Sequence, residues 1–197
     1  MCRFGANLNL RYWKPVQTGI EADDDTAEVR RLSGASPEQV LDEGVRLPRP
    51  LSPHLSATLA GRPISLAALM DLAWSQPDTD RWVVEGAGGV LVPLNEQELM
   101  VDLITVLGLP VVITARSTLG TINHTLLTIE ALRARAVPIA GVVMLGPLNQ
   151  DNRVAIETRG HVTVVGELPA FDPLTPEALR AAAGTLAVRG ELDAFCA

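Results

Sequence analysis

The residues best suited to chemistry are a lysine and a glutamate, each at the predicted end of a strand. Lys14 is the only lysine beside fifteen arginines, and the strand predicted over residues 11–14 must stop there because Pro15 cannot donate to a sheet. Glu85 follows the apolar run Trp82–Val84, which is typical of a buried parallel strand. Open α/β sheets bind ligands where their strands end. Lys14 and Glu85 therefore favour a ligand site over the alternative that the lysine is an ordinary exposed surface residue.

Three glycines follow Glu85 within four positions, at 86, 88 and 89. A loop without Cβ atoms can bring backbone N–H groups against phosphate or carboxylate oxygens. The alternative is a strand that simply ends in a tight turn. Thr18 adds a hydroxyl to the loop expected after Lys14.

Three consecutive aspartates, Asp23, Asp24 and Asp25, precede a helix predicted over residues 27–32. One aspartate is enough to cap the free N–H groups of a first turn, and capping is the favoured interpretation. The run could also supply an oxygen ligand for Mg²⁺, which prefers carboxylates and phosphate oxygens.

Composition limits the class of protein. The 197 residues are 47% hydrophobic with a net charge of −7, which excludes a disordered chain and argues against general nucleic-acid binding. No apolar run is long enough to span a membrane, and Met1–Phe4 lacks the pattern of a signal peptide. Cys2 and Cys196 stand at opposite ends, so we expect a soluble cytoplasmic protein without disulfides.

Strands and helices are predicted to alternate along the chain. The predicted helices cover residues 54–60, 64–75, 96–107, 121–135, 150–158 and 175–187, and the later strands cover residues 109–115, 139–145 and 161–168. Residues 36–53, rich in proline, are expected to be irregular. This order predicts a single α/β domain over residues 1–197, with a doubly wound, mostly parallel sheet and helices on both faces.

The segment 116–123 leads into the long helix predicted over residues 121–135. A helix opened by glycine and threonine exposes unpaired N–H groups, which suit an anion. Simple N-capping is the alternative, and the same segment could lie at a subunit contact.

Taken together, these segments resemble the dethiobiotin synthetase family, biotin-pathway enzymes of the P-loop NTPase group. The matching pieces occur in the family's order and span residues 11 to about 175: residues 14–19, Asp25-Thr26, residues 51–54, residues 85–89, residues 119–124 and residues 166–169. The ordered set is specific, although single pieces occur in other proteins.

The resemblance implies that ATP drives closure of a cyclic urea from 7,8-diaminononanoate and CO₂ in a cytoplasmic homodimer. Lys14 would stabilise the developing negative charge, and Thr18 would contact the diamine or its carbamate. Asp25 and Glu85 would hold Mg²⁺ against the phosphates. The remaining implied contacts are Gly86, Ala87, Gly88 and Pro169 near the nucleotide, and Leu119, Gly120, Thr121 and Asn123 on the substrate's carboxylate across the dimer's two-fold axis.

Two features depart from the family pattern. Members begin with a strand and a P-loop before the lysine segment, whereas here thirteen residues precede Lys14 and no G-x-x-x-x-G-K-[ST] motif occurs. Leu145 also stands where the family has an asparagine that reads adenine, and leucine cannot supply that donor and acceptor.

Either the recorded chain begins at an internal methionine of a normal enzyme, or it is a degenerate homologue. We therefore expect weak or no ATP-dependent activity from residues 1–197. The alternative functions are a non-catalytic binding or partner protein, and another NTPase of the same fold, such as a partitioning ATPase, which would still need the P-loop lysine.

Overall fold

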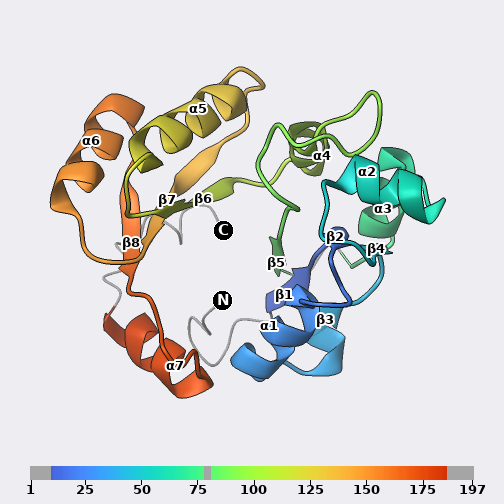
Figure 1. Ribbon diagram of the computed structural model, residues 1–197, viewed down its shortest axis with the longest axis horizontal. Coiled ribbons are helices and arrows are strands. Elements are labelled where there is room, and N and C mark those ends of the chain that lie inside the picture. Colours follow the sequence, from blue (N-terminus) through green and yellow to red (C-terminus); the bar gives the residue numbers. More distant parts are fainter. Residues whose placement is uncertain (1–9, 78–80, 186–197) are drawn as a thin grey trace. The chain divides into compact units, whose positions relative to one another are not determined.

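The computed structural model describes residues 10–77 and 81–185, except for the side chains of residues 183–185 (Figure 1). The chain forms two compact units that meet in the sequence between Leu107 and Gly108. Each unit is an α/β assembly of parallel strands, so the predicted fold class is confirmed. The single domain expected over residues 1–197 stays a prediction. Among the described helices, none is long and apolar enough to cross a membrane.

The first unit contains two small parallel sheets. Its elements are β1 (Leu10–Trp13), β2 (Val16–Thr18), α1 (Asp25–Ser33), the 3-10 helix η1 (Pro37–Gln39), β3 (Val40–Leu41), β4 (Val45–Leu47), α2 (Pro53–Ala60), α3 (Leu66–Trp74), β5 (Arg81–Val84) and α4 (Met100–Leu107). One sheet has the order β3-β1-β5, and the other pairs β2 with β4. Pro15 separates β1 from β2, and its carbonyl accepts a hydrogen bond from the Val45 N–H at 2.9 Å.

The register of β1 and β5 brings two strand ends together. Tyr12 lies opposite Val83 and Trp13 opposite Val84, and the Glu85 N–H donates to the Trp13 carbonyl at 2.9 Å. Lys14 and Glu85 are therefore the first residues beyond two neighbouring parallel strands, at the edge where the sequence predicts them.

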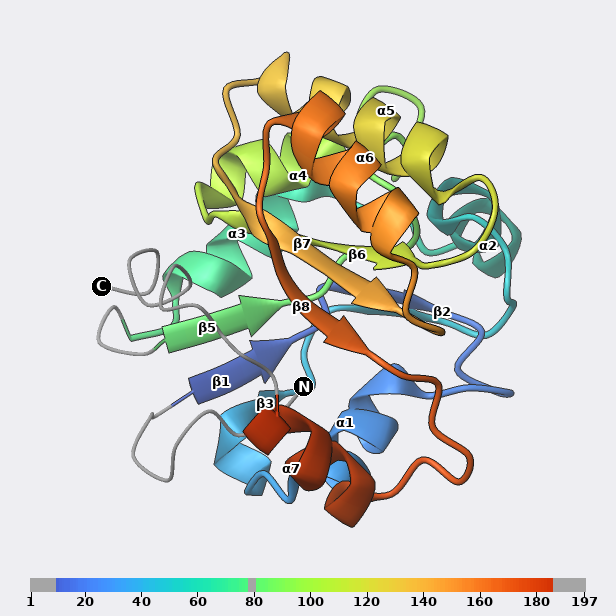
Figure 2. The same ribbon diagram turned by 90° about the vertical axis from the view of Figure 1, so that its left-hand side faces the viewer.

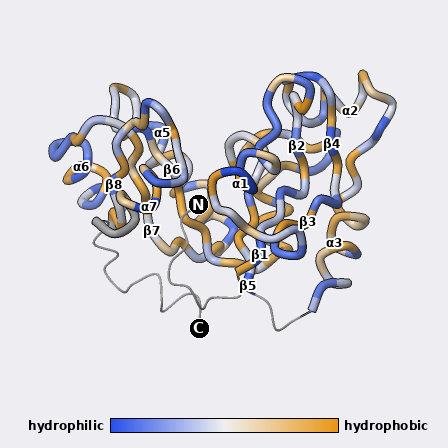
Figure 3. The backbone as a smooth tube through the Cα atoms, turned by 90° about the horizontal axis from the view of Figure 1, so that it is seen from below, coloured by the Kyte–Doolittle hydropathy of each residue, from blue (hydrophilic) through white to orange (hydrophobic). Residues whose placement is uncertain are grey.

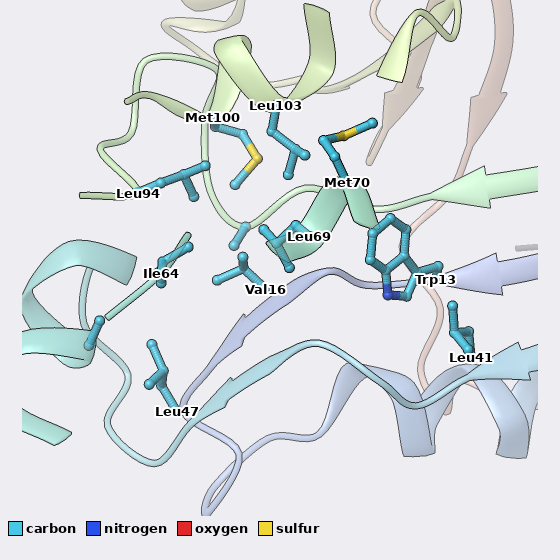
Figure 4. Close-up of a cluster of buried hydrophobic side chains, with 12 residues drawn as sticks. Trp13, Val16, Leu41, Leu47, Ile64, Leu69, Met70, Leu94, Met100 and Leu103 are labelled. Carbon is cyan, nitrogen blue, oxygen red and sulfur yellow. The ribbon is translucent and has the colours of Figure 1, made fainter. Parts of the chain in front are cut away.

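Alternation along β1 separates a core face from a polar face. Trp13 points into the core of the first unit, where it packs with Met70 of α3 and Leu103 of α4 (Figure 4). α3 and α4 cover this face of the sheet, and α1 lies on the other (Figure 2). Tyr12 and Lys14 face the side of α1.

Several predicted boundaries in the first unit are wrong. Residues 36–53 contain η1, β3 and β4 instead of irregular chain, and Thr18 ends a strand instead of lying in a loop. The helix predicted from residue 96 begins at Met100, because the preceding backbone bonds elsewhere: Asn95 Oδ1 accepts from the N–H groups of Gln97 and Glu98, and the Met100 N–H donates to the Val92 carbonyl.

The second unit alternates strictly between strand and helix. Its elements are β6 (Val111–Arg116), α5 (Thr121–Arg133), β7 (Ile139–Leu145), α6 (Gln150–Gly160), β8 (Val164–Leu168) and α7 (Pro176–Thr185). The parallel sheet has the order β6-β7-β8, with α5 and α6 side by side on one face (Figures 1 and 2). α6 is hydrophilic along much of its length (Figure 3).

Boundaries in the second unit are close to those predicted. β7 has the predicted limits, whereas β6 begins at Val111 and α5 ends at Arg133. β8 begins at Val164 instead of residue 161, because His161 ends α6 with a left-handed φ of 46°. Residues 186 and 187 of the last predicted helix lie outside the described part of the chain.

A bulge at the start of β7 depends on a glycine. Val111 pairs with Ile139 and Val112 with Gly141, so Ala140 is an extra residue in this ladder. Gly141 has a φ of 156°, and a Cβ there would lie 2.5 Å from Val165 Cγ1 and 3.1 Å from the Thr163 carbonyl oxygen.

We predict that Gly141→Ala lowers the free energy of unfolding by about 1–3 kcal/mol, because the added methyl group overpacks the contact with β8. Urea unfolding followed by circular dichroism measures this loss. Gly89→Ala is the matched control, since a Cβ at Gly89 meets no atom within 4 Å. Equal stability of the two variants would contradict the steric argument.

Candidate active site

Lys14 is buried, with only 8% of its surface exposed. Its Nζ lies 2.6 Å from Asp25 Oδ2 and 2.7 Å from Glu85 Oε1. The two carboxylates are 40% and 43% exposed, so one side of the ion cluster opens to solvent. A surface role for this lysine is excluded, and the structure brings together the three charged residues that the sequence analysis selected.

The three consecutive aspartates at residues 23–25 make different contacts. Asp24 is the N-cap of α1 and accepts a hydrogen bond from the Ala27 N–H at 3.1 Å, which confirms the capping interpretation for one residue. Asp25 begins the helix with its carboxylate on Lys14. Asp23 is exposed. Capping by Asp24 therefore leaves Asp25 available to the ion cluster.

Tyr12 belongs to the same cluster. Its hydroxyl donates to Glu85 Oε2 at 2.7 Å, so Glu85 accepts from Tyr12 with one oxygen and from Lys14 with the other. Sequence reasoning missed Tyr12. The available signal was the two-residue spacing from Lys14 along β1, which puts both side chains on one face of the sheet.

The cluster keeps Lys14 charged and Tyr12 neutral. Burial by itself lowers the pKa of Lys14, but hydrogen bonds and charge attraction from Asp25 and Glu85 outweigh it and raise that pKa above its ordinary value. Burial, reinforced by the bond to Glu85 and nearby negative charge, raises the pKa of Tyr12 well beyond its ordinary range. The cluster thus combines one ammonium, two carboxylates and a phenol that donates to one of the carboxylates.

A second polar network fixes the start of α1. The fully buried Gln17 accepts from the Thr26 hydroxyl at 3.1 Å and donates to Asp24 Oδ1 at 3.3 Å. Arg46 of β4 donates to Asp24 Oδ2 at 2.5 Å. β2 and β4 therefore hold the residues on either side of Asp25, and with them the backbone that carries its carboxylate.

The glycine loop after Glu85 has a conformational reason as well. Gly88 has a φ of 79°, and a Cβ there would approach Val92 Cγ2 to 3.0 Å. Ala87 is buried in the core of the first unit. The tight-turn interpretation therefore accounts for Gly88, and contacts of Gly86, Ala87 and Gly88 with a nucleotide stay a prediction.

The second unit presents uncharged groups near the start of α5. Gly120 is the N-cap of α5 and makes no side-chain hydrogen bond, so no side chain caps the first turn, and the Thr121 N–H donates to the Thr118 carbonyl at 3.2 Å. Leu119 and Asn123 are exposed, whereas the hydroxyl oxygens of Ser117 and Thr121 are buried with no hydrogen-bond partner among the described residues. The anion site at the start of α5 stays a prediction.

Two further positions selected from the sequence lie at strand ends of the second unit. Pro169 comes directly after β8 and is exposed, and Leu145 ends β7 with 41% of its surface exposed. Contact between Pro169 and a nucleotide stays a prediction, as does the effect of Leu145 on recognition of adenine.

Oxygen ligands at Asp25 and Glu85 suit Mg²⁺, but they are few. Within the described residues, no group of three or more His, Cys, Asp or Glu side chains could hold a metal ion. Mg²⁺ is commonly bound by one or two carboxylates, with water and substrate phosphates completing its octahedron. The pair therefore fits a Mg²⁺ ion that arrives with a phosphate compound.

Comparison with known proteins defines the class. A family model described as an AAA domain matches residues 4–178, in agreement with the parallel α/β architecture. Proteins named ATP-dependent dethiobiotin synthetase BioD are similar along most of the chain. The relative from Brucella ovis is 46% identical over 172 residues, which cover 87% of this chain and 79% of the relative. A relative from Brucella melitensis biotype 2 is 47% identical over the same shares. The chain belongs to the dethiobiotin synthetase family.

The Asp24 contacts predict an acid-dependent loss of stability. Desolvation raises the pKa of Asp24, but the Ala27 N–H and the Arg46 guanidinium outweigh it and hold that pKa below its ordinary value. A lowered folded-state pKa adds stability above the unfolded pKa of about 3.9, and this stability is lost as pH falls through the folded pKa.

We therefore predict that Asp24→Asn, which retains a capping side chain, lowers the free energy of unfolding by about 1 kcal/mol at pH 7. The difference from wild type should shrink as pH falls from about 5 to 2, as urea unfolding at several pH values would measure. Asp23→Asn is the control at an exposed neighbour. A difference that stays constant with pH would contradict the role of the Asp24 charge.

Proposed function

We propose that this protein is an ATP-dependent dethiobiotin synthetase, which closes the ureido ring of dethiobiotin from 7,8-diaminononanoate, CO₂ and ATP. The buried Lys14 between Asp25 and Glu85 is the observation that carries the proposal. It supplies a fixed cation beside two partly exposed carboxylates, and the chain's family membership supports assigning that arrangement to this reaction.

The reaction gathers negative charge at one place. An amine of the substrate loses a proton and captures CO₂ as a carbamate. The carbamate oxygen attacks the γ-phosphorus of ATP, so that the bond to the β-phosphate breaks, ADP leaves and a mixed anhydride forms. The second amine then attacks the carbonyl carbon, the ring closes and phosphate leaves. Lys14 would stabilise the charge on the attacking and transferred oxygens, because a preorganised ammonium needs no reorganisation as that charge forms.

Asp25 and Glu85 would hold Mg²⁺, which when bound neutralises charge on the phosphate oxygens. Thr18 would contact the diamine or its carbamate. Gly86, Ala87, Gly88 and Pro169 would lie near the nucleotide. Because the reaction consumes ATP, we assign the enzyme to the cytoplasm.

The start of α5 would receive the carboxylate of the substrate, in a homodimer whose partner subunit supplies the other groups. Uncapped N–H groups favour an anion, and the buried hydroxyls of Ser117 and Thr121 are donors without a partner among the described residues. Leu119 is fully exposed and therefore accessible to a second copy. Residues 119–121 and Asn123 are the contacts proposed for this carboxylate.

We expect residues 1–197 to form dethiobiotin very slowly or not at all, because this stretch contains no G-x-x-x-x-G-K-[ST] motif to bind the ATP phosphates. Reaction with the protein in excess over diaminononanoate, followed by mass spectrometry of dethiobiotin, detects even a slow rate. Turnover equal to that of the Brucella ovis relative would refute this expectation. Calorimetry with MgATP and then with diaminononanoate tests the two binding sites separately, and binding without any product would favour the non-catalytic alternative.

We predict that Lys14→Met lowers the rate of dethiobiotin formation at least about 100-fold, because it removes a fixed donor from the transition state. Arg81→Met, which removes an exposed cation at the start of β5, should leave the rate unchanged. The rate is measured in single-turnover experiments with ¹³C-bicarbonate. A Lys14→Met variant as fast as Arg81→Met would refute the proposed role of Lys14.

A further inference from the structure

Tyr12 joins a central strand of the sheet to the more exposed carboxylate of the ion cluster. It is 3% exposed and lies within β1, between β3 and β5. Glu85 is 43% exposed, and within the described residues its carboxylate has one other side-chain partner, Lys14. The bond of 2.7 Å from the Tyr12 hydroxyl to Glu85 Oε2 therefore restrains the second oxygen.

The hydrogen bond from Tyr12 to Glu85 does more than provide an acceptor for a buried hydroxyl. A buried tyrosine usually finds any available acceptor, and backbone carbonyls commonly serve. Trp13, the next residue along β1, does this by donating its indole N–H to the Glu43 carbonyl at 2.7 Å. Tyr12 instead donates to a carboxylate that also contacts the one lysine of the chain.

We propose that Tyr12 is a positioning residue that orients the Glu85 carboxylate for a divalent cation. With Oε2 held by Tyr12 and Oε1 by Lys14, the carboxylate cannot turn both oxygens toward the ammonium, and its remaining lone pairs stay available to a metal ion. The inference rests on the proposed function, because it takes Glu85 as a Mg²⁺ ligand. Tyr12, which lies in β1, would thus act together with the three charged residues of the site.

The orientation of the Glu85 carboxylate should affect metal binding more than it affects binding of the diamine. Without the hydroxyl, Glu85 is free to give both oxygens to Lys14 or to turn into solvent, and a metal ion must then reorder it. Groups that hold a metal ligand in place typically contribute about 10- to 100-fold to metal affinity. Binding of the diamine has no direct connection to the hydroxyl, so its KM should change little.

The test compares Tyr12→Phe, which retains the ring, with Trp13→Phe, which removes a neighbouring buried hydrogen bond outside the cluster. Mn²⁺ is titrated into each protein, alone and with ATP, and free Mn²⁺ is followed by electron paramagnetic resonance. We expect about 10-fold weaker Mn²⁺ binding for Tyr12→Phe and less than about 2-fold change for Trp13→Phe. Thermal unfolding records the stability of both variants.

Tyr12 is also the only tyrosine of the chain, so a ¹³Cζ-tyrosine label gives one assignable resonance. In the wild type this resonance should shift when Mg²⁺ and ATP are added, and Glu85→Gln should remove that response. This measurement needs no variant at Tyr12 and therefore does not depend on the folding of Tyr12→Phe.

Unchanged Mn²⁺ affinity in Tyr12→Phe, or a Tyr12 resonance that ignores saturating Mg²⁺ and ATP, would overturn the inference and leave a structural role only. The binding experiments need no turnover. Product formation with normal metal binding by Tyr12→Phe would thus reject the positioning role while supporting the proposed function. Weaker metal binding by Tyr12→Phe without product in the wild type would do the reverse.

Discussion

The organisation of the first unit depends on the burial of one positive charge. An ammonium removed from water is strongly unfavourable unless opposite charges and hydrogen bonds replace its hydration. Lys14 obtains both from Asp25 and Glu85, which come from the start of α1 and the end of β5. The cluster therefore ties together the end of β1, the start of α1 and the end of β5. Asp25 is also the first residue of α1, and a separate network built on Asp24 and Arg46 holds that helix end.

The sequence was sufficient for the parts of this site that depend on local rules. Pro15 ends β1 next to Lys14, an apolar run ends at Glu85, and an aspartate caps α1, each for a reason that involves only neighbouring residues. The pairing partners could not be predicted in the same way. Tyr12 and Glu85 are 73 positions apart, and their bond depends on the register of β1 against β5. β3 and β4, with two and three residues, are too short to show a periodic pattern.

The two units offer different chemistry for ligands. The first gathers formal charges, with one ammonium and two carboxylates that remain partly open to solvent. The second offers uncharged donors, namely the uncapped first turn of α5 and the buried hydroxyls of Ser117 and Thr121. Buried polar groups in folded proteins nearly always have partners, so two such hydroxyls near one helix start are unusual. Periodicity predicted the helix there, but hydroxyl burial depends on packing that no local pattern contains.

The choice of lysine at position 14 follows from the geometry of the cluster. Arginine occupies the other fifteen basic positions, so composition alone would favour a guanidinium here. A guanidinium is a planar fork suited to bidentate contact with one carboxylate, whereas an ammonium is compact and has three rotatable donors. Lys14 uses two of them on carboxylates from different elements, at 2.6 and 2.7 Å. The third can serve an oxygen on the open side of the cluster. A point charge of this kind fits a buried position between two anions and still faces a reacting group, which a guanidinium fork would not do without displacing one of them.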